Sequence, residues 1–175
     1  MPAFLPGRPQ PSEYHAAFAG YVAKAESFED PVAKLTAQLE ELLGLLAPLH
    51  AEKRLHRYAP GKWSVQEVLG HLTDAERIFA DRALRIARGD ATPLAGFDEN
   101  AYVAAAEAER CDWNELLLEF EHVRRSSVLQ FRHLPEAAWA AMGTSNHAPV
   151  SVRALACIMI GHVTHHLDIL RERYL

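Results

Sequence analysis

Apolar residues recur at intervals of three and four in four long stretches of the chain, the spacing of one buried helix face. In the first stretch the repeating leucines run from Leu35 to Leu46. The stretches predict long helices at about residues 31–48, 64–88, 112–133 and 151–173. Apolar and polar residues do not alternate for long anywhere, so no extended strand is expected.

Capping residues mark where three of these helices begin. Asp30 precedes Pro31, which places an N-cap beside a proline at the first helical position. Ser64 and Glu67 have the spacing of a capping box, in which each side chain accepts a hydrogen bond from the backbone amide of the other. Ser151 is suited to cap the last helix.

The connecting segments are expected to be short or irregular. Four of the ten prolines lie in residues 1–11 and exclude a helix there, whereas a short helix is expected over about residues 12–25. The segment 90–102 is predicted to form an ordered loop followed by a short helix, and residues 143–149 are predicted to form a polar turn region.

Together these elements predict an all-α fold, a four-helix bundle with short additional helices. An N-terminal extension with a short helix would cover residues 1–29, and the bundle domain residues 30–175. The length of 175 residues suits one such domain, since domains commonly have ~100–150 residues or somewhat more.

Charge and cysteine content narrow the range of functions. The net charge of -5, with both signs mixed along the chain, provides no basic face for nucleic acid and no polybasic membrane patch. Only two cysteines occur, Cys111 and Cys157, too few for a disulfide framework. No charged start followed by an apolar run marks a signal peptide, and no stretch has the ~20 apolar residues of a membrane span. A cytoplasmic protein is expected.

The last predicted helix carries histidines in its apolar stripe. At about 100° per residue, His162 lies near the centre of the stripe and His166 about 40° away, whereas His165 lies about 60° to the other side. An i, i+4 histidine pair can bind one metal ion. Alone, such a pair is more often a surface or hydrogen-bonded core feature. Burying two imidazoles in an aliphatic face without partners is costly, which favours the metal.

His71, on the second predicted helix, is the third candidate ligand, because it lies on one side of that helix's apolar stripe. Glu67 and Asp74 share this side. Either carboxylate could orient a ligating imidazole or act as a base near a metal-bound water. The alternative is that Glu67 only completes the capping box and that Asp74 is solvated.

The remaining histidines are expected at the surface, although His147 could overhang a pocket from its loop. They are His15, His50, His56, His122, His133 and His147. Cys157 faces away from His162, so a thiolate ligand is not expected.

Three motifs resemble the DinB-like superfamily, also called the DinB/YfiT-like metalloenzyme group. They begin at Trp63, Gly96 and Gly161 and read WSVQEVLGHLTDAER, GFDENAY and GHVTHHLDIL. The combination of a helix start W-S-x-x-E-x-x-x-H-L-x-D with a late H-x-x-H-H is specific, although each half alone is loose. The resemblance covers about residues 30–175.

The resemblance implies a four-helix bundle whose metal ligands are His71, His162 and His166. It also implies one divalent ion, nickel or zinc, and a homodimer. Relatives with assigned activities include thiol-dependent S-transferases and a mycothiol-dependent isomerase. This chain departs from many relatives in having Leu167-Asp168 where they have Gly-Gln.

Three neutral nitrogen ligands leave positions open for water or substrate, which is typical of catalytic zinc sites. The expected functions are therefore a metal-dependent hydrolase or a low-molecular-weight-thiol S-transferase, acting on a small molecule that the sequence does not specify. A thiol, if used, should be external, since neither Cys111 nor Cys157 lies on the histidine stripe. The alternative is a non-enzymatic, metal-stapled module for binding or stress response.

Overall fold

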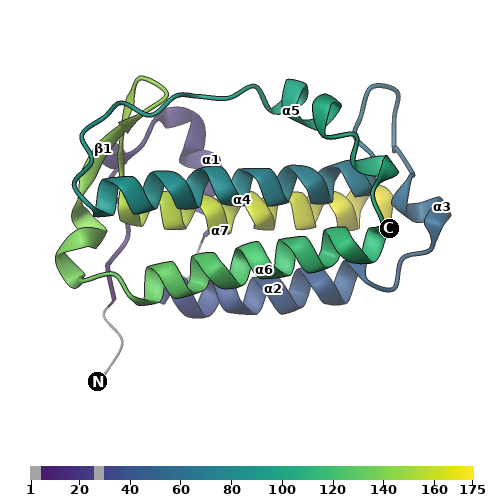
Figure 1. The fold of residues 1–175 in the computed structure, drawn as a ribbon, viewed down its shortest axis with the longest axis horizontal. Helices are drawn as coiled ribbons and strands as arrows, with labels where there is room; N and C mark the ends of the chain where they lie inside the picture. The colour runs from purple at the N-terminus through teal and green to yellow at the C-terminus, as the bar shows by residue number, and fades with distance from the viewer. Residues whose placement is uncertain (1–4, 26–29) are drawn as a thin grey trace.

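The computed structural model describes residues 5–25 and 30–175 and consists mainly of helices (Figure 1). The α-helices are α1 Ala19–Lys24, α2 Pro31–Leu46, α3 Ala51–Arg54, α4 Val65–Ala87, α5 Glu99–Ala106, α6 Trp113–Arg132 and α7 Val152–Ile169. The 3₁₀-helices are η1 Pro11–Glu13, η2 Ala16–Phe18, η3 Ala108–Arg110 and η4 Glu136–Ala140, and the π-helical end of α7 is η5 Leu170–Tyr174. Two strands, β1 Met142–Ser145 and β2 Ala148–Ser151, complete the fold.

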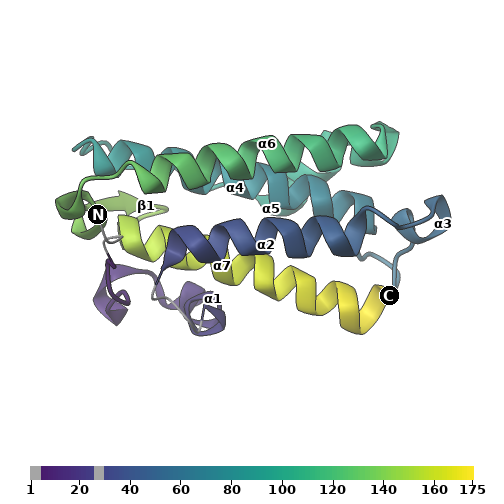
Figure 2. The same cartoon turned by 90° about the horizontal axis from the view of Figure 1, so that it is seen from below.

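The long helices α2, α4, α6 and α7 form a four-helix bundle, as predicted (Figures 1 and 2). Their bounds agree with the predicted ones to within about two residues, except that π-helix η5 continues the last helix. Figure 1 shows α5 lying across the outer side of α4, and α1 packs against α7. The bundle therefore presents α4 and α7, the two helices with candidate ligands, to these short helices.

Side-chain caps explain where the long helices begin. Asp30 accepts a hydrogen bond from the amide of Ala33, and Ser151 accepts one from the amide of Ala154. Ser64 and Glu67 form both hydrogen bonds of the predicted capping box. Each cap satisfies amides that the helix itself leaves without acceptors. The cap at Ser64 fixes the start of α4, two turns before His71.

The prediction of one short N-terminal helix over residues 12–25 is wrong about the extent of that helix. The described part of this segment forms η1, η2 and the six-residue α1. Between η1 and η2 the backbone is extended at Tyr14. Glu13 there is bound by the Arg153 guanidinium and the Ser151 hydroxyl near the start of α7. This contact with a distant segment explains why a continuous helix does not form. The predicted domain boundary, at residue 29, lies outside the described residues.

The predicted polar turn over residues 143–149 is instead the centre of a β-hairpin. Strands β1 and β2 pair antiparallel, with Ser145 opposite Ala148. Asn146 and His147 form the two-residue loop, and both have positive φ, 49° and 63°. That combination is typical of the tight hairpin turn whose twist matches the strands. Leu94 pairs with the hairpin edge, so the loop before α5 is fixed to it.

The buried apolar residues form two clusters along the bundle axis. On α4 one cluster ends at Leu72 and the other begins at Ala75, and on α7 the change falls between Ile160 and Val163. His71 and His162 lie at this boundary. The histidines thus occupy a polar layer between two apolar parts of the core.

Candidate metal centre

His71 from α4 meets His162 and His166 from α7 inside the bundle. Each offers a ring nitrogen, and these three nitrogen atoms lie within 4.8 Å of one another. The Nε2 atoms of His71 and His162 are 3.0 Å apart. For comparison, two nitrogens bound to one zinc ion at ~2.0–2.1 Å in tetrahedral geometry are about 3.4 Å apart. The arrangement therefore fits a single divalent ion.

The three imidazoles are buried and held mainly by aromatic rings. Their exposed fractions are 4% for His71, 5% for His162 and 8% for His166. The Trp63 ring lies 4.8 Å from that of His71 and stacks on His166 at 6.5 Å. Tyr21 packs edge-on against His162 at 5.3 Å. These ring contacts restrict the imidazoles, and His71 and His162 can share one hydrogen bond through their Nε2 atoms.

Tyr21 reaches His162 because α1 approaches α7 very closely at Gly161. A Cβ atom at Gly161 would lie 1.8 Å from the backbone oxygen of Tyr21, so a side chain at this position would displace α1. Asp168 forms an ion pair with Lys24, which ties the end of α1 to α7. Asp168 is part of the pair that departs from the Gly-Gln of many relatives. Its side chain supports α1 and does not join the histidine cluster.

Burial keeps these histidines neutral near pH 7. It lowers the pKa of His71 from 6.5 to about 4, and burial together with the neighbouring His71 and His165 lowers that of His166 to about 3. The pKa of His162 falls well below its usual value, mainly through burial and then through the other two histidines. A neutral imidazole has a free lone pair, which is the form that binds a metal ion.

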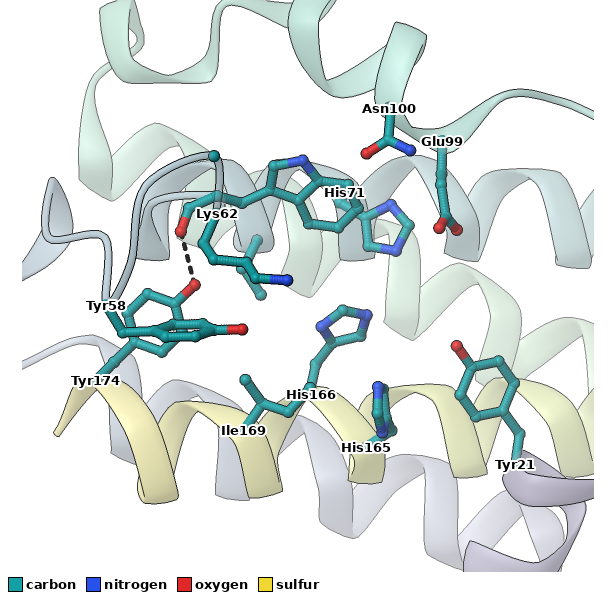
Figure 3. A pocket seen from close by; sticks show the side chains of 13 residues that line it. Tyr21, Tyr58, Lys62, His71, Glu99, Asn100, His165, His166, Ile169 and Tyr174 are labelled. Atoms are coloured by element: carbon teal, nitrogen blue, oxygen red, sulfur yellow. Dashed lines mark hydrogen bonds between the residues drawn. The ribbon is translucent and has the colours of Figure 1, made fainter.

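Two cavities border the histidines. The first has a volume of about 270 Å³ and includes His71, His166, Lys62 and Glu99 in its wall (Figure 3). The second, of about 160 Å³, includes His71, His162 and Glu99. His71, Tyr21 and Glu99 belong to both walls. A metal ion on the three histidines would therefore be accessible from two sides.

Comparison with known proteins agrees with this architecture. The family model described as DinB superfamily matches residues 34–170. The chain belongs to the DinB superfamily. None of the curated proteins matches it.

One similar solved structure is YfiT from Bacillus subtilis, described as a probable metal-dependent hydrolase with an unusual four-helix bundle topology. The TM-score is 0.69 at 14% identity, covering 94% of this chain and 92% of that chain. At this identity the likeness establishes the fold alone. Across residues 5–25 and 30–175, no helix has both the length and the apolar character to cross a membrane.

The two carboxylates predicted near the metal have other partners in this DinB fold. Glu67 forms two hydrogen bonds with Arg57, at 2.5 and 3.0 Å, besides its capping-box contact. Asp74 lies 3.7 Å from Arg77, and burial raises its pKa. Neither lines the two cavities. These contacts fit the capping and structural alternatives, and a catalytic role for either carboxylate stays a prediction.

His165 lines the first cavity, where its ring lies 5.5 Å from Tyr21 and 5.3 Å from His166. His147, in the hairpin turn, is exposed and lines neither cavity. Cys157 is buried, which raises its pKa to about 11, and Cys111 is exposed away from both cavities. The described cysteines are therefore unsuited to supply a reactive thiolate at the histidines.

Several side chains around the histidines were not predicted from the sequence, among them Tyr21, Lys62, Arg82 and Glu99. Glu99 falls within the GFDENAY motif, which carries part of the family resemblance but assigns no role to this residue. Lys62 and Arg82 are not singled out by the resemblance. Tyr21 lies before the region that the family model matches.

Proposed function

We propose that this protein is a metal-dependent hydrolase of small molecules, with one divalent ion held by His71, His162 and His166. The observation that carries the proposal is the cluster of three buried, neutral imidazoles that opens onto two cavities. Neutral imidazoles buried without carboxylate partners are costly unless something binds their lone pairs. The description of YfiT as a probable metal-dependent hydrolase supports the same reaction class.

A divalent ion in such a site supplies Lewis acidity toward a carbonyl oxygen and acidity to a water molecule. The protein's own residues would orient the reactants and accept the proton. Glu99 is suited to accept it, because its carboxylate borders both cavities. Figure 3 shows Lys62 and Glu99 extending into the first cavity from different sides, beside His71 and His166. Lys62 would attract an anionic group of the substrate into this cavity.

Imidazole ligands suit zinc and nickel alike, so the donor set agrees with both metals that the resemblance implies. A thiol S-transferase is the second candidate. It is favoured by the same open cavity, and it would require an external thiol because Cys111 and Cys157 lie away from the histidines.

Metal content of protein purified without a histidine tag tests the site. We expect about one divalent ion per chain in the wild type and a large loss of affinity in the single variants His71→Ala, His162→Ala and His166→Ala. His165→Ala is the matched control, because this neighbouring histidine lies outside the cluster. A chelator should lower the melting temperature of the wild type, because a ligand that binds only the folded state stabilises it.

Activity distinguishes the candidate functions. Metal-loaded protein should hydrolyse members of an ester and amide panel without added thiol, and Glu99→Gln should reduce this rate while retaining the metal. Conjugation of an electrophile only when a thiol is added would favour the S-transferase. Equal metal content in wild type and His162→Ala, with no effect of a chelator, would contradict the site itself.

We also propose a homodimer, on the basis of the family resemblance. Light scattering at tens of micromolar checks it, since a mass near the 19.5 kDa of one chain would contradict the dimer.

A further inference from the structure

The second cavity combines aromatic walls with one buried cation, Arg82, and one exposed carboxylate, Glu99. Phe18, Phe79 and Phe97 contribute rings, and Arg82 contributes the charge. His162 lies in the same wall, with its ring 6.0 Å from Phe79. The volume of about 160 Å³ accommodates a group of about the size of benzene. The cavity therefore has room for one small apolar group, with a positive charge at Arg82 and a carboxylate at Glu99 in its wall.

Arg82 is unusual because it is buried without an ion pair. Its exposed fraction is 6%, and it forms no ion pair with any carboxylate in residues 5–25 or 30–175. The other deeply buried arginine, Arg124, contacts the carboxylate of Glu76 at 2.9 Å. Burial lowers the pKa of Arg82, and nearby Asp81 opposes this, yet a guanidinium remains protonated in proteins. Buried charges are normally paired, and with no carboxylate at ion-pair distance among the described residues Arg82 can pair with a ligand from outside the chain.

A purely structural role accounts for only part of the Arg82 side chain. One nitrogen, Nη2, donates to the backbone oxygen of Ala95 at 2.7 Å and so holds the loop before α5. The guanidinium carbon lies 5.7 Å from the Phe79 ring centre and 5.9 Å from that of Phe97. A guanidinium has five N–H donors, and its planar fork matches a carboxylate. Donors are left for a ligand in the cavity.

We propose that the second cavity binds a substrate carboxylate on Arg82, with a small apolar body between the aromatic rings. Phe79 contacts both Arg82 and His162, so a molecule anchored on Arg82 extends past Phe79 toward the histidines. The substrate class is then a small ester or amide that carries a carboxylate near an aryl or similar apolar group. The reaction rests on the proposed hydrolase function, whereas the binding step does not need the metal.

Binding of phenylacetate and of the uncharged phenylacetamide, measured by calorimetry, tests the assignment. We expect the wild type to bind phenylacetate about tenfold or more tightly, as charge-assisted hydrogen bonds provide. Arg82→Gln should abolish the preference. Arg77→Gln, which changes a half-exposed arginine of the same helix, should retain it.

The same measurements after chelation of the metal separate Arg82 from metal ligation, because a carboxylate can also bind a metal ion. The preference should persist in the chelated protein. If chelation abolishes it, or if Arg82→Gln retains it, the assignment is wrong. It is also wrong if the wild type shows no preference.

Arg82→Lys covers the case in which Arg82→Gln disturbs the loop held at Ala95. This variant retains the positive charge without the planar guanidinium and should keep a reduced preference for phenylacetate over phenylacetamide. A preference equal to that of the wild type would contradict a contact between the guanidinium fork and the carboxylate. If the protein binds no metal and hydrolyses nothing but keeps the Arg82-dependent preference, the hydrolase proposal fails and the carboxylate site stands.

Discussion

The buried pair of Glu76 and Arg124 should be strongly coupled in stability and yet replaceable as a unit. Glu76 on α4 is 2% exposed and Arg124 on α6 is fully buried. Arg124 also lies 3.4 Å from Gln38 on α2, whose amide donates to the Ile160 carbonyl and the Thr164 hydroxyl on α7. These side chains therefore connect all four helices of the bundle.

The hydrogen bonding of this pair is incomplete. The two charges lie 2.9 Å apart, but Arg124 Nη2 and Nε and Glu76 Oε1 find no hydrogen-bond partner among residues 5–25 and 30–175. The distance alone suggests a strong bond, whereas the unmet donors and acceptor indicate that the contact is mainly electrostatic. A hydrogen bond needs direction as well as distance, and this pair meets only the distance. Burial accordingly lowers the pKa of Arg124, and Glu76 opposes this.

From these contacts we expect Arg124→Met and Glu76→Leu each to lower the free energy of unfolding by ~3–5 kcal/mol, because each leaves one buried charge without its partner. The double variant should lie within ~1–2 kcal/mol of the wild type or exceed it, because it removes both desolvated charges. The coupling energy between the two sites should then be several kcal/mol.

Urea unfolding followed by circular dichroism at pH 7 measures all four proteins, with metal content held equal. Loss of the Gln38 contact occurs in both proteins that lack Arg124 and cancels from the coupling energy. Additive effects of the two single variants would refute this account. A Glu76→Leu variant as stable as the wild type would refute it as well.

Two further predictions concern stability in acid and the packing of α1 against α7. In metal-free protein, stability should fall as the pH decreases from 6.5 to about 4, because the unfolded chain then binds protons that folded His71 and His166 exclude. The free energy of unfolding should change by about 1.4 kcal/mol per pH unit for each histidine. Measured between pH 5 and 7, this free energy should depend less steeply on pH in His71→Gln than in the wild type. Gly161→Ala should cost ~1–3 kcal/mol by pushing α1 and Tyr21 away from α7. Gly44→Ala, where the added methyl group meets nothing, should instead stabilise α2 by ~0.5–1 kcal/mol, and equal melting temperatures for these two variants would contradict the close contact at Gly161.

The sequence by itself determined the four long helices and the direction of their histidines. Helix periodicity and caps are local properties, so Ser64 and Ser151 mark the starts of α4 and α7 before any packing is considered. The same periodicity puts His162 and His166 on one face of one helix. Once that face is buried against α4, His71 on α4 has few positions to occupy other than beside His162 and His166.

Only the tertiary structure decided which other side chains surround the histidines. Tyr21 and Glu99 come from the short helices α1 and α5, and they reach the cavities through packing that no local pattern encodes. Arg82 lies about three turns after His71 on the same face of α4, but the cavity that it lines forms only when α5 and the loop before it pack there. The partner of Glu67 was likewise undecided, because Arg57 comes from the preceding loop and competes for its carboxylate. Local sequence sets backbone conformation within a turn or two, whereas the choice among distant polar partners depends on how the helices and loops pack together.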